Sequence, residues 1–247
     1  MNMQPVLVLL HGHGVDAAIW DDLYADLSAD YTIIRPDLSK LTTHASIEAY
    51  AEHLSGLLQT AQVDGCVLVG HSMGGYIALA FAEQHPDQMA GLCLFHSTAL
   101  ADDDAKREQR RKTIQKLREN GGKAFIEEII LKMMGETFRQ QHPDRVEQLV
   151  ERYRQLPDEA LTVGMQAIAA RPDRTDILKN ADFPVLFIAG RKDELIPFEK
   201  LEPQFSLSPR IRSVVLDEAG HLGMIESPDE AIVAMREFMK EIQSGAA

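Results

Sequence analysis

Six short apolar runs, separated by longer stretches with helical periodicity, constrain the fold of this chain more than any other feature. The runs are Val6–Leu10, Tyr31–Ile34, Cys66–Val69, Leu92–Phe95, Val185–Ala189 and Ser213–Leu216. Their hydrophobicity is continuous rather than alternating, which is typical of strands covered by helices on both faces. The pattern therefore predicts an α/β fold with a mostly parallel sheet of about six strands flanked by helices.

The stretches between these runs predict the helices that cover the sheet. We expect helices near Ala17–Leu27, Ser46–Gln59, Gly74–Gln84 and Pro228–Gln243. The last has a clear start signal, because Ser227 can cap it, Pro228 suits its first turn and Glu230 stands at the capping-box position.

The alternation of strands and helices is interrupted once, after the fourth predicted strand. Four helical patterns follow one another there, at about Asp104–Glu119, Lys123–Met134, Asp144–Leu156 and Asp158–Ala170. An all-helical insertion at this point would lie over the carboxyl ends of the strands, where ligands bind in parallel α/β folds. We expect a core domain of residues 1–96 and 181–247 and a helical lid of residues 97–180.

The charge balance argues against two classes of partner. The chain has 38 acidic and 25 basic residues and a formal net charge of −13, which would repel nucleic acids and anionic membrane surfaces. The dense basic run 106–112 is broken by Glu108, and we interpret it as a solvated helix face. We expect a small-molecule substrate, no nucleic-acid or membrane partner, and a monomer or homodimer.

The cysteines and the first residues of the chain bear on the compartment. Cys66 and Cys93 both lie inside apolar runs, which suits free buried thiols in a reducing environment. The first ten residues lack the basic start of a secretory signal, and their apolar run is too short for a membrane span. A cytoplasmic location is therefore expected.

A serine on a glycine-flanked turn is the first sign of chemistry. The sequence Gly70-His71-Ser72-Met73-Gly74 directly follows one predicted strand and directly precedes a predicted helix. Glycines permit the sharp turn that holds a serine hydroxyl out of the backbone toward a base. Because chance alone can almost supply a G-x-S-x-G pattern, other residues must decide whether the serine is reactive.

The partners that a serine nucleophile needs are present at the ends of other predicted strands. Asp193 lies in the loop after the run that ends at Ala189, and His221 lies in the loop after the run that ends at Leu216. The first strand leads into His11-Gly12-His13-Gly14, a turn that can aim a backbone N–H inward. A base, a group that orients it and oxyanion donors are the parts that such a nucleophile requires.

These motifs, in the chain order Ser, Asp, His, resemble those of the α/β-hydrolase family, and the resemblance covers nearly the whole chain. It implies that Ser72 is the nucleophile, His221 the general base and then acid, and Asp193 the carboxylate that orients the imidazole. It also implies an oxyanion hole made by the backbone N–H groups of His13 and Met73. The implied reaction is hydrolysis of an ester-like bond through an acyl-enzyme, with no cofactor and no metal.

A substrate pocket should lie between this site and the lid. Its candidate lining residues are His96, Met133, Met134, Phe138 and Met165. The lid side chains among them are equally suited to packing the lid helices together. His11 and His71 are expected to hydrogen-bond the loop backbone rather than to act in catalysis.

The chain departs from the family pattern in two places. Its first strand begins almost at the N-terminus, so we expect about six strands instead of eight, without the antiparallel hairpin that commonly comes first. The loop 35–40 keeps the aspartate of the family as Asp37 but lacks the glycines that usually follow it. Neither departure affects Ser72, Asp193 or His221.

Other functions remain open from the sequence. Thioesterases, lactonases, C–C bond hydrolases and perhydrolases share this fold and triad, so the motifs do not separate them. A metallohydrolase is suggested weakly by His11 and His13 followed by Asp16, although no second ligand cluster is evident. A slow or non-catalytic ligand-binding receptor on the same fold is the third alternative.

Overall fold

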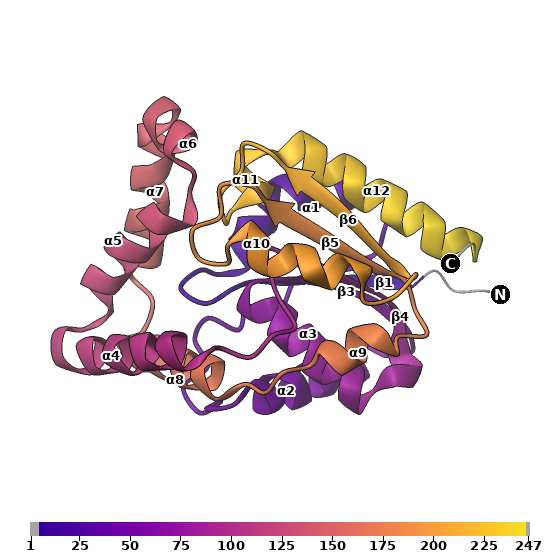
Figure 1. Cartoon of the computed structure of the whole chain (residues 1–247), viewed down its shortest axis with the longest axis horizontal. Coiled ribbons are helices and arrows are strands. Elements are labelled where there is room, and N and C mark those ends of the chain that lie inside the picture. The colour runs from indigo at the N-terminus through magenta and orange to yellow at the C-terminus, as the bar shows by residue number, and fades with distance from the viewer. Residues whose placement is uncertain (1–4, 246–247) are drawn as a thin grey trace.

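The computed structural model describes residues 5–245, and within this range a parallel sheet of six strands forms the centre of the molecule (Figure 1). The strands are β1 (Val6–Leu10), β2 (Ile33–Ile34), β3 (Cys66–His71), β4 (Met89–Phe95), β5 (Val185–Gly190) and β6 (Ile211–Leu216). Their order is β2-β1-β3-β4-β5-β6, and every neighbouring pair is parallel. The predicted fold class is confirmed.

The edge strand β2 is shorter than the sequence predicts. Only Ile33 and Ile34 pair with β1, whereas the apolar run begins at Tyr31. The two residues that do not pair lie at the start of the run, where the N–H of Tyr31 donates to the carbonyl of Leu27 in the preceding helical turn, at 3.0 Å. The strand therefore begins only after this turn has closed.

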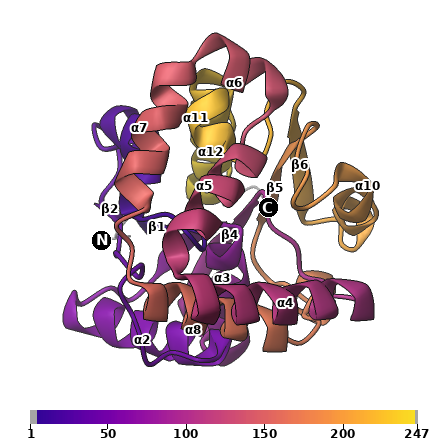
Figure 2. The same ribbon diagram turned by 90° about the vertical axis from the view of Figure 1, so that its left-hand side faces the viewer.

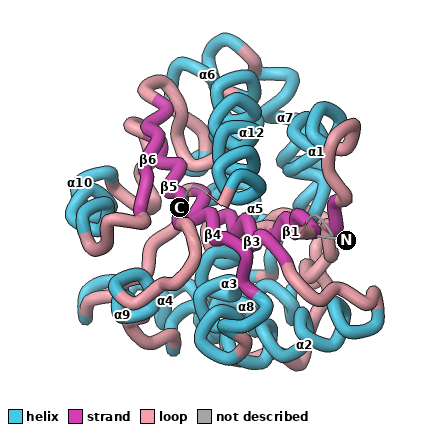
Figure 3. Tube along the Cα trace, turned by 90° about the vertical axis from the view of Figure 1, so that its right-hand side faces the viewer, coloured by secondary structure: helices cyan, strands magenta, loops and turns pink. Residues whose placement is uncertain are grey.

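Side chains alternate between two apolar layers, one on each face of the sheet. In β1, Leu7 and Leu9 pack on the face covered by α1 (Asp21–Leu27) and α12 (Pro228–Ser244). Val8 and Leu10 pack on the opposite face, against α2 (Ile47–Thr60) and α3 (Met73–Gln84). Figure 3 shows the sheet in section between these two helical layers. Burial on both faces explains the continuous hydrophobicity of the runs.

Shorter elements complete the core. They are η1 (Ala17–Trp20), η2 (Pro86–Gln88), α9 (Thr175–Lys179), α10 (Phe198–Leu201), η3 (Glu202–Ser206) and α11 (Gly223–Glu226). The predicted cap of α12 is wrong, because the Ser227 side chain makes no capping hydrogen bond. The backbone N–H of Ser227 instead donates to the carbonyl of Gly223. This bond closes the turn of α11, which runs directly into α12.

The insertion between β4 and β5 is helical, and it lies beyond the carboxyl ends of the strands (Figure 1). Its helices are α4 (Asp104–Asn120), α5 (Gly122–Met133), α6 (Glu136–Gln141), α7 (Pro143–Tyr153) and α8 (Asp158–Ala170). The expectation of four helices missed α6, which spans only six residues and is too short to show a periodic pattern. Figure 2 looks onto the insertion, with α4 and α8 running across below α5 and α7.

A buried charge network fixes both ends of the insertion to the core. The Arg171 guanidinium donates to Asp102 at 2.8 Å and lies over the ring of Tyr76, 4.1 Å from its centroid. Asp102 also accepts a hydrogen bond from Arg110 of α4 at 2.7 Å. Since Asp102 precedes α4 and Arg171 follows α8, the network ties the entry and the exit of the insertion together.

A search of the described residues for membrane-crossing segments finds no helix with the length and apolar character required.

Candidate active site

Ser72 occupies a strained turn between β3 and α3. Its φ is +52° and its ψ is −115°, a conformation that non-glycine residues rarely adopt. The turn is held by hydrogen bonds from the Ser72 N–H to the carbonyl of Phe95 and from the Ser97 hydroxyl to the carbonyl of Ser72, at 3.1 and 2.8 Å. A strained backbone secured in this way presents the serine side chain at the carboxyl edge of the sheet.

Gly70 and Gly12 are required because other atoms lie so close to them that a side chain would not fit, and not because the backbone needs the flexibility of glycine there. A Cβ on Gly70 would collide with the backbone of Gly74 and Gly75, where strand and helix cross. A Cβ on Gly12 would lie 2.7 Å from Nδ1 of His71 and 3.1 Å from Cβ of Ser72. The glycine pattern around Ser72 therefore reflects the contact of the strand end, the helix start and the first loop.

His221 and Asp193 form a buried pair at the ends of β6 and β5. Nδ1 of His221 lies 2.6 Å from Oδ2 of Asp193, and neither side chain is more than 1% exposed. Nε2 of His221 is buried and has no hydrogen-bond partner among the residues that the structure describes. The carboxylate therefore selects the tautomer with the proton on Nδ1, and the lone pair on Nε2 remains available as a base.

The Asp193 carboxylate is held in its ionised form. Its other oxygen, Oδ1, accepts hydrogen bonds from the N–H groups of Leu195 and Ile196, both at 2.9 Å. Burial alone would raise the pKa of Asp193, but the imidazoles of His221 and His96 lower it well below its usual range. A carboxylate that stays charged while buried can both orient an imidazole and stabilise its protonated form.

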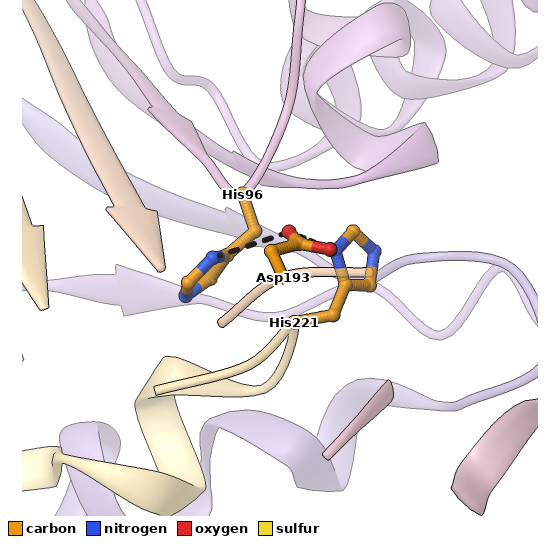
Figure 4. A group of neighbouring side chains, drawn as sticks. All are labelled: His96, Asp193 and His221. Carbon is orange, nitrogen blue, oxygen red and sulfur yellow. Dashed lines mark hydrogen bonds and ion pairs between the residues drawn. The ribbon is translucent and has the colours of Figure 1, made fainter. Parts of the chain in front are cut away.

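His96 lies on the opposite side of Asp193 from His221, as Figure 4 shows. Its ring has no exposed surface, and Nδ1 lies 3.6 Å from Oδ2 of Asp193. The N–H groups of Gly190 and Gly223 point at Nδ1 and Nε2, at 3.0 and 3.1 Å. Burial lowers the pKa of His96, so the ring is neutral and can accept from only one of these donors. The His96 ring lies against the Asp193 carboxylate on the side away from His221, where no surface is open to a substrate.

His71 and His11 serve the loop backbone, as expected from the sequence. Nε2 of His71 donates to the carbonyl of His221 at 2.8 Å, and burial lowers the pKa of His71 well below its usual value. Nε2 of His11 accepts from the N–H of Leu38 at 2.8 Å, while its Nδ1 donates to the carbonyl of Gly12. The His71 ring thus joins the Ser72 turn to the His221 loop, whereas the His11 ring joins the first loop to the loop at Leu38.

The first loop brings His13 beside Met73. The two residues border one small cavity, and the N–H of His13 donates to no group within residues 5–245. Met73 is the first residue of α3, so its N–H precedes the hydrogen-bond ladder of the helix. Two such amides can stabilise a developing oxyanion.

The His13 side chain has a role of its own, which the sequence did not indicate. Nε2 donates to the carbonyl of Leu161 in α8 at 2.7 Å, and the edge of the ring meets Phe125 of α5 at a centroid distance of 5.6 Å. Burial lowers the pKa of His13 to about 4. The imidazole thus joins the first loop of the core to two helices of the insertion.

Glu226 is a further residue that the sequence analysis missed. Its Oε2 accepts from the N–H groups of Gly135 and Gly220, at 2.7 and 3.0 Å, and its Oε1 accepts from Leu222 at 3.0 Å. One carboxylate therefore holds the residues on both sides of His221 and the linker between α5 and α6. No sequence pattern marks it, because its partners are backbone N–H groups, and one of them, that of Gly135, is 91 residues away.

The remaining candidate pocket residues all belong to the insertion. Met133 and Met134 are buried where α5 ends, and the carbonyl of Met133 accepts the N–H of His221 at 2.6 Å. Phe138 is half-buried on α6, where its ring packs against His142. Met165 is buried on α8 and lines a groove between α4 and α5. The end of α5 is therefore in direct contact with the His221 loop.

The buried trio His96, Asp193 and His221 also has the composition of a metal site. Its candidate ligand atoms lie within 4.8 Å of one another. However, two atoms that bind one zinc ion tetrahedrally at about 2 Å lie about 3.3 Å apart, whereas Nδ1 of His221 and Oδ2 of Asp193 are 2.6 Å apart. The spacing fits a hydrogen bond. His11 and His13, the pair considered from the sequence, contact separate partners, the Leu38 N–H and the Leu161 carbonyl.

Comparison with known proteins agrees with this geometry. The family model described as "Alpha/beta hydrolase family" matches residues 7–235 of the chain. A pimeloyl-[acyl-carrier protein] methyl ester esterase of Aliivibrio salmonicida is 27% identical over 241 residues, which cover 95% of this chain and 92% of that protein. Uncharacterized proteins of Mycobacterium tuberculosis and Mycobacterium bovis are 32% identical over 105 residues, which cover 40% of this chain and only 31% of theirs.

A solved structure is similar over nearly the whole chain. It is a thermophilic esterase from Thermogutta terrifontis with malate bound, 31% identical, with a TM-score of 0.90. The match covers 96% of this chain and 90% of the esterase.

Proposed function

The chain belongs to the α/β-hydrolase family, and from this premise we propose that it is a serine hydrolase that cleaves ester-like bonds through an acyl-enzyme. The names of the esterases similar to it along nearly their whole length support an ester as the bond attacked. The proposed substrate is a small or medium-sized, largely apolar molecule.

In the proposed mechanism, Nε2 of His221 removes the proton of the Ser72 hydroxyl as the oxygen attacks the substrate carbonyl. The N–H groups of His13 and Met73 stabilise the oxyanion of the tetrahedral intermediate. His221 then protonates the departing alcohol, which leaves an acyl group on Ser72. Water, activated by the same imidazole, releases the acid and restores the serine.

The observation that carries this proposal is the state of the His221 ring. Nδ1 is bound to the buried Asp193 carboxylate at 2.6 Å, while Nε2 has no partner among the described residues. A ring held in this tautomer has one unused function, that of a base at Nε2. The strained Ser72 turn lies beside it, since the neighbouring residue His71 donates to the carbonyl of His221.

Several finer points belong to the same proposal. We infer that residues 97–180 act as a lid over the core formed by 1–96 and 181–247, because the insertion contacts the first loop and the His221 loop. Cys66 and Cys93 are free and buried, and burial raises the pKa of Cys66 to about 12, which suits inert thiols in the cytoplasm. A monomer or homodimer without a nucleic-acid or membrane partner is consistent with the net charge of −13.

The proposal is tested by turnover of short-chain 4-nitrophenyl esters. Replacing the nucleophile in Ser72→Ala should lower kcat by about 10³-fold or more, because the members of a triad act as a unit. Ser206→Ala is the control, because its exposed hydroxyl donates to the carbonyl of Pro203, away from the candidate site. Equal rates in wild type and Ser72→Ala would refute the assignment.

Three further measurements separate the alternatives. Rapid labelling of Ser72 by a fluorophosphonate is expected of a catalyst, whereas a folded sample that is not labelled would favour a ligand-binding receptor. A screen of esters, thioesters and lactones over a range of chain lengths then identifies the bond type, and retained activity in a strong chelator is expected because no step uses a metal.

A further inference from the structure

A groove of about 480 Å³ runs between α4 and α5 on the insertion. Its size is in the range of small-molecule sites. Its walls carry five cationic side chains: Lys106, Arg110, Lys112, Lys116 and Lys132. The single carboxylate among the lining residues is Glu128. The lining of the groove is therefore positively charged, although the chain as a whole has a net charge of −13.

Three of the five cations form no ion pair within the described residues. Arg110 is paired with Asp102 at 2.7 Å, and Lys132 with Glu128 at 2.6 Å. Lys106, Lys112 and Lys116 have no carboxylate within ion-pair distance between positions 5 and 245. Burial and the nearby Arg110 guanidinium lower the pKa of Lys106, although the carboxylates of Asp102 and Asp103 act in the opposite direction.

The outer face of α4 shows the contrasting arrangement. Arg107 pairs with Asp104 and Arg111 pairs with Glu108, each across one turn of the helix at 3.6 and 3.1 Å. These residues do not line the groove. Arg107 and Arg111 are therefore paired within their own helix, whereas Lys106 and Lys116 on the groove face form no ion pair within the described residues.

The floor of the groove is apolar and lies against the candidate active site. Phe125 meets the His13 ring edge-on, and the backbone N–H of Leu195 donates to Asp193. Both residues line the groove, together with Met165, Ile129 and Ala124. The groove thus passes from residues that support the oxyanion loop and the carboxylate to a cationic rim on the surface.

We propose that this groove binds the far end of the substrate, and that this end carries an anionic group, a carboxylate or a phosphate. The inference rests on the proposed function and specifies its substrate class. The substrate is an ester whose apolar acyl chain lies on the floor of the groove, with a terminal anion that reaches one of the lysines that form no ion pair within the described residues. Ammonium groups on long side chains bind either anion, so carboxylate and phosphate are distinguished by experiment.

The test compares two esters of equal reach, 4-nitrophenyl hexanoate and the mono-4-nitrophenyl ester of adipate. Wild type should hydrolyse the adipate ester with a kcat/KM about fivefold higher at low salt, the size expected for one partly screened charge contact, because Lys106 and Lys116 lie about 15 Å apart along α4. This preference should shrink as salt rises from about 0.02 to 0.5 M. The same chain ending in a phosphate monoester shows which anion is preferred.

The decisive variant is Lys106→Gln/Lys116→Gln, with Arg107→Gln/Arg111→Gln on the outer face as its control. Both remove two positive charges from the same helix. The first should abolish the preference for the anionic ester and leave the neutral ester unchanged, whereas the second should keep the preference. A neutral ester that is cleaved as fast as the anionic one by wild type, with no difference between the variants, would overturn the inference and leave the proposed function intact.

Binding measured without turnover tests the groove independently of the proposed hydrolysis. Calorimetry with 7-oxooctanoate and with the neutral ketone 2-octanone needs no hydrolysis. Tighter binding of 7-oxooctanoate to wild type, lost in Lys106→Gln/Lys116→Gln, supports the groove even if no ester is cleaved. Equal binding of the two ketones counts against it.

Discussion

The loops at the carboxyl ends of the strands and the groove face of the insertion are built in opposite ways. In the loops, polar groups are buried and bonded: Asp193 accepts from two backbone N–H groups and contacts two imidazoles. In the groove, long cationic side chains line an open surface, and Lys106, Lys112 and Lys116 have no ion pair within the described part of the chain. The loop side chains are therefore held in a single arrangement, whereas the lysine side chains of the groove remain free to change conformation.

This difference indicates that the loops serve catalysis and the groove serves substrate recognition. Catalytic groups must be held within a fraction of an ångström, which requires burial and fixed hydrogen bonds. Recognition of an anion at the end of a chain tolerates flexible donors, because charge attraction falls off slowly with distance. Contacts that join the core to the insertion include the packing of Arg171 on Tyr76 and the hydrogen bonds His13–Leu161, His221–Met133 and Glu226–Gly135. Perturbing each region and each connection in turn tests the comparison.

The largest effect is expected when Asp193, at the centre of the buried loops, is replaced. Asp193→Asn should lower kcat for a 4-nitrophenyl ester by about 10³-fold or more, because an amide can impose the wrong tautomer on His221. Asp217→Asn is the control, since Asp217 follows the neighbouring strand but only pairs with Arg191 on the surface. If both variants kept wild-type rates, the buried pair would not be part of the catalytic machinery.

The next effect concerns the network that closes the insertion. Arg171→Met leaves the buried Asp102 with Arg110 as its remaining partner, and the free energy of unfolding should fall by about 2 to 4 kcal/mol. Urea denaturation measures this loss. Arg111→Met, which removes an exposed ion pair on the same insertion, should change stability by about 0.5 kcal/mol or less. Equal losses in the two variants would mean that the network does not anchor the insertion.

A pH-dependent effect is expected at the His13 connection. The pKa of His13 is about 4 in the folded chain and about 6.5 when unfolded, so the unfolded state binds more protons between these values. Its contribution to stability is complete above pH 6.5 and is lost as the pH falls toward 4, by about 2 kcal/mol at pH 5.

His13→Gln isolates this contribution from that of the other buried histidines. The variant should lose less stability than wild type when urea denaturation is repeated at pH 7.5 and at pH 5. His142→Gln is a control, because the His142 side chain is exposed on the insertion. Parallel pH profiles for wild type and His13→Gln would contradict the prediction.

The smallest effect is expected at Glu226, which touches both regions without contacting substrate. Glu226→Gln replaces one acceptor oxygen with a donor that faces the N–H groups of the His221 loop, and kcat should fall about tenfold with little change in KM. Glu230→Gln, four residues later and exposed, should behave as wild type. A change in KM alone would place the role of Glu226 in the insertion rather than in the loop.

Some of the site could be predicted from the sequence because it depends on local order. Ser72 lies between a strand run and a helix run, and Asp193 and His221 each follow a strand, so a parallel sheet brings all three to the same edge. Their roles in catalysis remain proposals. Glu226 and the His13 side chain could not be found in this way, because their partners are backbone groups more than 90 residues away for Gly135 and 148 away for Leu161.

The sequence by itself determined the fold class, the parallel sheet and the order of the candidate catalytic residues, because continuous apolar runs and glycine turns are local signals of buried strands and sharp connections. The tertiary structure alone decided which cations line a groove. Arg107 and Arg111 pair with carboxylates of their own helix, but only packing against α5 turns the other face of α4 into a groove. Helical periodicity gives the faces of a helix, whereas its neighbours decide what each face encloses.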